Sequence, residues 1–156
     1  MLPFIRKSYA DIFEDFYNIT NGDIILGGSL SLKLQNIISR DINDLDLAIN
    51  KSDWNKYESK IIKKYKIYYG QLISLPPKME NRVCTCFNKE NKNEFHLFIN
   101  NIENDMFNIV GFNDALIRVF KPELHLLDKE YMLADDITNT KNISDVDSIK
   151  KYLNAK

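Results

Sequence analysis

Ile24-Ile25-Leu26-Gly27-Gly28-Ser29 is the stretch that decides the fold, together with Asp44-Leu45-Asp46-Leu47 a short way downstream. An apolar run ending in Gly-Gly-Ser predicts a strand that turns sharply into a helix, because glycine permits tight turns and Ser29 can cap the helix. Backbone N–H groups at such a turn form a site for an anion such as phosphate. The sequence therefore predicts a phosphate-binding turn at Gly27, Gly28 and Ser29.

The second stretch carries two carboxylates, Asp44 and Asp46, on either side of Leu45. Residues i and i+2 of a strand project to the same face, so these carboxylates are expected to converge. Like charges at close range repel each other, and a divalent cation relieves that repulsion. A phosphate-binding turn beside a metal site of paired carboxylates indicates phosphoryl or nucleotidyl transfer.

Together the two stretches resemble the nucleotidyltransferase superfamily typified by DNA polymerase beta. Its pattern is hydrophobic-Gly-Gly/Ser, a spacer, then Asp-hydrophobic-Asp/Glu-hydrophobic. The sequence is most similar to small bacterial and phage members, including toxin–antitoxin types, which read Gly-Gly-x-x-Leu, a helix, then Arg and Asp-Ile-Asp-Leu. The strong match covers Asp23 to Asn50.

This resemblance implies that Mg²⁺ or Mn²⁺ bound by Asp44 and Asp46 assists the transfer of a nucleoside monophosphate. The donor would be an NTP, and the acceptor a hydroxyl of a protein, RNA or small molecule. Gly27, Gly28 and Ser29 would bind the nucleotide. The alternative is a catalytically silent protein of the same fold that serves as a nucleotide-binding or protein-interaction module.

Arg40 corresponds to an arginine that is common in the small relatives. By that resemblance Arg40 is a nucleotide-binding residue that could reach the phosphates as a bidentate donor. A surface ion pair with Asp41 or Asp44 is the alternative.

The superfamily usually adds a third carboxylate on a later strand, and here His96 occupies that position within Phe95-His96-Leu97-Phe98-Ile99. His96 is therefore the third candidate catalytic residue beside Asp44 and Asp46. Strand alternation places Glu94 on the same face, two residues along. Imidazole is a poor ligand for Mg²⁺ and suits Mn²⁺ better. His96 is a metal ligand, a weak base, or a polar residue in a degenerated site.

The C-terminal region resembles the small relatives more weakly. They often carry a lysine on a late helix and then a segment similar to Lys-Asp-x-x-Asp. Lys141-Asn142-Ile143-Ser144-Asp145 resembles the second element, whereas Asp135-Asp136 stand where the lysine is expected. Loss of that cation would weaken nucleotide affinity. The alternative role for Lys141 and Asp145 is to cap the last helix.

The composition of the chain indicates the number of domains, the classes of partner and the location of the protein. A length of 156 residues with 44% hydrophobic content predicts one domain over residues 1–156. The net charge of −1 gives no strong indication of nucleic-acid binding. Cys84 and Cys86 are too few for a disulfide framework, and with only two histidines a structural zinc site is not expected. Without a signal peptide or a long apolar run, a cytoplasmic protein with no membrane partner is expected.

Hydrophobic periodicity and turn residues predict the order of the elements. Helices are expected at 8–17, 30–38, from Ser52 through Tyr65, 122–136 and 143–153, and strands at 23–26, 44–50, 66–74, 82–88, 94–99, 106–110 and 115–120. Helices and strands in this order predict an α+β fold. With the resemblance, we expect a nucleotidyltransferase-like mixed β-sheet with helices packed mainly on one face.

Overall fold

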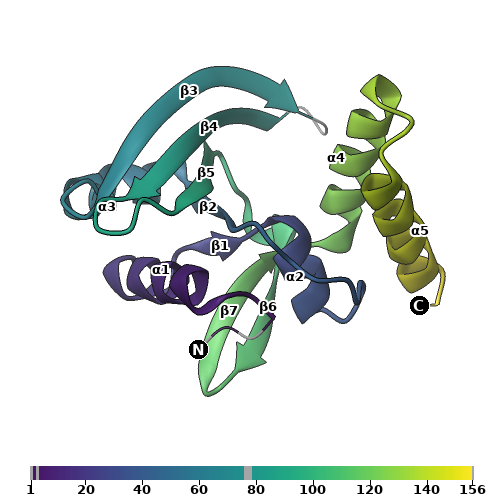
Figure 1. Ribbon diagram of the computed structural model, residues 1–156, viewed down its shortest axis with the longest axis horizontal. Helices are drawn as coiled ribbons and strands as arrows, with labels where there is room; N and C mark the ends of the chain where they lie inside the picture. The colour runs from purple at the N-terminus through teal and green to yellow at the C-terminus, as the bar shows by residue number, and fades with distance from the viewer. Residues whose placement is uncertain (1, 3, 76–78, 156) are drawn as a thin grey trace.

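The computed structural model describes residues 2, 4–75 and 79–155 (Figure 1). Their elements, in chain order, are α1 (Lys7–Ile19), β1 (Ile25–Leu26), α2 (Gly28–Leu34), β2 (Asp46–Asn50), α3 (Lys51–Ile61), β3 (Tyr65–Leu75), β4 (Met79–Asn88), β5 (Glu94–Asn100), the short 3-10 helix η1 (Asn104–Met106), β6 (Phe107–Phe112), β7 (Ala115–Phe120), α4 (Pro122–Asp135) and α5 (Thr140–Asn154). This content confirms the α+β class.

One seven-stranded mixed sheet has the order β3-β4-β5-β2-β1-β7-β6. The pairs β2/β5 and β1/β7 are parallel, and the other neighbouring strands are antiparallel. The two stretches that decide the fold therefore form the adjacent central strands, since Leu26 of β1 pairs with Leu47 of β2.

The main core lies between one face of the sheet and the helices α1, α2 and α3. Apolar side chains at helical spacing on α1 and α3 pack against inward-facing strand residues, which confirms that the helices cover mainly one face. The buried residues include Ile12, Phe13, Phe16, Trp54, Tyr57, Leu26, Leu47, Ile49, Phe95 and Leu97.

The opposite face of the sheet carries a smaller apolar cluster of Ile25, Ala48 and Ile102. Strand alternation puts Asp46 on the same face as Ala48, and His96 on the same face as Phe98, which packs against this cluster. The polar candidates on β2 and β5 therefore lie on the face opposite the main core.

The helices α4 and α5 lie side by side at one end of the molecule (Figure 1). Asn139 caps α5, because its side chain accepts a hydrogen bond of 3.0 Å from the backbone N–H of Asn142. The expectation that Lys141 and Asp145 form this cap is therefore wrong. No helix in the described ranges is long and apolar enough to cross a membrane.

Several element boundaries differ from the sequence predictions. The helix after the glycines ends at Leu34, because Asn36 adopts a left-handed φ of 60°. Strand β2 begins at Asp46 and excludes Asp44. Gly27, and not Ser29, is the residue that precedes α2 as its cap. Tyr65 is buried as expected, but at the start of β3.

Candidate functional site

The Gly27-Gly28-Ser29 turn lies directly against β2. The backbone N–H of Gly27 donates a 2.9 Å hydrogen bond to the carbonyl oxygen of Asp46. Gly28 has a φ of 60°, and a Cβ at Gly28 would lie 3.1 Å from both Cβ and Cγ of Asp46 and would overlap its carboxylate. Only glycine combines this backbone conformation with so close an approach. The structure thus brings the predicted turn and Asp46 together.

The two predicted metal-binding carboxylates differ in their surroundings. Asp46 is half-buried at the start of β2, whereas Asp44 is exposed in the segment without regular secondary structure before it. Leu45 between them is buried, which leaves both acidic residues outside the core. Within the part of the chain that the structure describes, no three His, Cys, Asp or Glu side chains gather as a set that could hold a metal ion.

His96 lies beside Asp46, at the position expected for a third acid. The two residues are paired in the parallel register of β2 and β5, and His96 Nδ1 is 3.5 Å from Asp46 Oδ1. The hydrogen bond with Asp46 raises the pKa of His96, although burial opposes the shift, and the charges of Glu94 and Asp44 add to it. Protonated His96 therefore forms an ion pair with Asp46.

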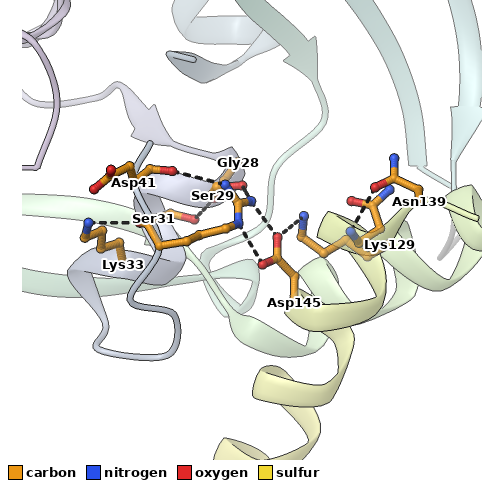
Figure 2. A network of polar contacts seen from close by, with 10 residues as sticks. Gly28, Ser29, Ser31, Lys33, Asp41, Lys129, Asn139 and Asp145 are labelled. Atoms are coloured by element: carbon orange, nitrogen blue, oxygen red, sulfur yellow. Dashed lines mark hydrogen bonds and ion pairs between the residues drawn. The ribbon is translucent and has the colours of Figure 1, made fainter. Parts of the chain in front are cut away.

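Arg40 is held by Asp145 of α5 (Figure 2). Its Nε and Nη2 donate to the two carboxylate oxygens at 3.0 and 2.7 Å, and Nη2 also donates to Ser29 Oγ at 2.6 Å. Its Nη1 donates to the backbone carbonyl of Asp41 at 3.3 Å. The expected surface ion pair with the side chain of Asp41 or Asp44 is therefore wrong. The arginine fork faces a buried carboxylate instead.

Lys129 is a site residue that the sequence reasoning missed. Its Nζ lies 2.9 Å from Asp145 Oδ2, and its side chain is only 8% exposed (Figure 2). Asp135 and Asp136 stand where the resemblance places a lysine, and Lys129, earlier on α4, is the lysine that contacts Asp145. The spacing of His125 and Lys129, four residues apart in the predicted helix 122–136, was the available signal, since it puts both on one helix face.

His125 connects α4 to the glycine turn. Its Nε2 lies 2.6 Å from Ser31 Oγ, and the Ser31 hydroxyl donates to the carbonyl of Gly28 at 2.7 Å. The ring therefore donates to Ser31 through Nε2–H. Burial lowers the pKa of His125 to about 3, with a further contribution from the charge of Lys129, so the ring is neutral at physiological pH.

Asp128 is a further residue that the sequence analysis did not single out. It lies three residues after His125, so it is on the same side of α4 as His125. Burial raises the pKa of Asp128, the charge of Lys129 opposes this, and the charge of Asp46 adds to it. The carboxyl group of Asp128 therefore interacts electrostatically with Asp46.

Comparisons with known proteins support this topology. No protein-family model and no curated protein match the sequence. A solved structure of a putative nucleotidyltransferase (TM1012) from Thermotoga maritima matches with a TM-score of 0.57 and 15% identity, over 97% of this chain and 96% of that one. This chain has a nucleotidyltransferase-like fold.

An antigenic nucleotidyltransferase-like protein from Paracoccidioides brasiliensis is a more distant match, with a TM-score of 0.48 and 12% identity over 92% of this chain and 74% of that one. The likeness to the Thermotoga maritima structure, at 15% identity, shows the fold alone.

Proposed function

We propose that the protein transfers a nucleoside monophosphate from an NTP to a hydroxyl of a protein, RNA or small-molecule acceptor, with the help of Mg²⁺ or Mn²⁺. The observation that carries the proposal is the close approach of Gly28 to the carboxylate of Asp46. This contact puts a turn suited to phosphate beside an acid suited to a metal ion.

The side chains present fit a metal–nucleotide complex. Asp46 and Asp44 offer the carboxylate oxygens that Mg²⁺ prefers, and the Asp46 side chain, which is 26% exposed, remains accessible to an ion. His96 beside Asp46 would favour Mn²⁺. A metal ion held there would neutralise phosphate charge and lower the pKa of an attacking hydroxyl.

The remaining residues have roles in holding the nucleotide. Ser29 and the backbone of the glycine turn would bind the phosphates, and Lys129 adds a nearby positive charge. Neutral His125 keeps Ser31 bonded to the Gly28 carbonyl and so stabilises the conformation of the turn. His96, when neutral, could accept a proton from the acceptor hydroxyl, as a weak base.

A labelled-transfer assay tests this proposal. The protein is incubated with each α-labelled NTP, Mg²⁺ or Mn²⁺ and cell lysate, and compared with the variant Asp44→Ala/Asp46→Ala. Transfer of label by the wild type and its loss in the variant would support the function. Asp147→Ala, at an exposed position of α5, is the matched control and should behave as wild type. Absence of labelled product from the wild type with either metal would reject the enzyme.

A catalytically silent nucleotide-binding or interaction module is the second candidate, because His96 replaces an acid and is paired with Asp46. That candidate predicts measurable NTP affinity, or a tight protein partner, without turnover. For the first candidate, the active nucleotidyltransferase, the resemblance would fit a cytoplasmic role within a toxin–antitoxin system. Identifying the labelled acceptor in the lysate would test that context.

A further inference from the structure

Asp145 on α5 joins the neighbouring helix α4 to the loop after α2, which is distant in the sequence. Its side chain is only 2% exposed and contacts Arg40, from the loop after α2, and Lys129, from α4. Burial raises the pKa of Asp145, but the hydrogen bonds and the positive charges of Arg40 and Lys129 together outweigh burial and keep this pKa below its ordinary value. Asp145 is thus a buried carboxylate anion shared by two cations (Figure 2).

The donors of Arg40 are nearly all used. A guanidinium has five N–H groups: one on Nε and two each on Nη1 and Nη2. Nε binds Asp145, Nη2 binds Asp145 and Ser29, and Nη1 binds the carbonyl of Asp41. Four of the five are therefore occupied, and Arg40 cannot bind a phosphate with its fork while Asp145 holds it.

The hydrogen bond from Arg40 determines which way the Ser29 hydroxyl group can donate. Its Oγ accepts a 2.6 Å hydrogen bond from Arg40, so the hydroxyl proton remains available for a different acceptor. Among the hydrogen bonds of the described residues, Ser29 Oγ takes part only as the acceptor of Arg40 Nη2. Since Ser29 belongs to the turn beside Asp46, a phosphate oxygen at the turn could accept this proton.

We propose that Asp145 is a positioning residue for nucleotide phosphates, which fixes the Arg40 guanidinium so that Arg40 orients the Ser29 hydroxyl as a phosphate donor. The proposal rests on the proposed function, which supplies the phosphate ligand. It changes the role of Arg40 from direct phosphate ligand to a link between α5 and the turn. Asp145, on the last helix, thereby becomes part of the nucleotide site.

A double-mutant cycle on ATP affinity tests the link. Calorimetry with ATP and Mg²⁺ is performed on the wild type, Asp145→Asn, Ser29→Ala and the double variant. A hydrogen bond to a charged group predicts a loss of about tenfold for each single variant. Because both changes remove the same interaction, the double variant should lose about tenfold to thirtyfold and not the product of about one hundredfold. Asp147→Asn, exposed on the same helix, should match the wild type.

Arg40→Lys provides the second variant if Asp145→Asn does not fold. Lysine keeps the charge that pairs with Asp145 but lacks the fork that also reaches Ser29. It should show the same loss and the same non-additivity with Ser29→Ala. Folded Asp145→Asn or Arg40→Lys with an affinity within about twofold of wild type, or losses that multiply, would overturn this inference alone. A wild type that binds neither ATP nor any of the other three NTPs would instead reject the proposed function, and this inference with it.

Discussion

Replacement of Gly28 by alanine perturbs the central contact of the site with a single methyl group. Gly28 has a left-handed φ of 60°, and the added Cβ would overlap the Asp46 carboxylate and lie 3.1 Å from Asp46 Cβ and Cγ. The obstacle is the short Asp46 side chain on a central strand, which can turn aside only by leaving the position that it occupies beside His96.

The expected loss of stability has two parts. A left-handed conformation costs an alanine about 1–2 kcal/mol. Overpacking against Asp46 adds about 1–3 kcal/mol. Together they predict that Gly28→Ala lowers the free energy of unfolding by about 2–5 kcal/mol, which is a large share of the about 5–15 kcal/mol of a typical domain.

Urea unfolding followed by circular dichroism measures this difference, and Gly111→Ala is the matched control. Gly111 lies on the edge strand β6, and a Cβ there would meet no atom within 4 Å. The control should remain within about 1 kcal/mol of wild type. Equal stabilities of Gly28→Ala and Gly111→Ala would refute the argument that the turn is in contact with Asp46.

Three further predictions concern the same region. The pKa of His125 is about 3 in the folded protein and about 6.5 in the unfolded chain, so the free energy of unfolding should fall as the pH drops below about 6.5, by up to about 1.4 kcal/mol per pH unit. His125→Asn should flatten this dependence on pH, and an unchanged slope in the variant would contradict the burial of His125. Ser31→Ala should cost about 1–3 kcal/mol in urea unfolding, because it leaves buried His125 without its partner, and a neutral result would count against the bond. Without metal, His96→Asp should lower the melting temperature, because the new carboxylate is repelled by Asp46. Added Mg²⁺ should raise the melting temperature of this variant more than that of the wild type, and an equal rise in both would show that His96 is not part of a metal site.

Short-range patterns predicted the centre of the fold well. The apolar run, the glycines and the Asp-Leu-Asp stretch have local meanings, so they anticipated β1, α2, β2 and the contact of the turn with Asp46. The parallel pairing of β2 with β5 then put His96 beside Asp46, the neighbourhood that the resemblance to the superfamily had implied for it. The role of each of these residues stays a prediction.

Long-range pairing was the part that the sequence could not supply. Arg40 and Asp145 are 105 residues apart, and no local pattern indicates that α5 returns to the glycine turn. Ser31 and His125 are similarly separated by 94 residues. Lys129 was overlooked because a charged residue in a helix is usually solvated, and only packing shows that this one is buried.

Calorimetric titration of ATP into the wild type and Asp46→Asn, with Mg²⁺, with Mn²⁺ and with a chelator, tests the central claim most directly. The account predicts that wild type binds ATP tightly only when a metal ion is present. It further predicts that Asp46→Asn, which keeps the shape of the side chain but loses its charge, binds at least about tenfold more weakly. ATP affinity that is independent of metal, or equal in wild type and Asp46→Asn, would contradict the proposed nucleotide site.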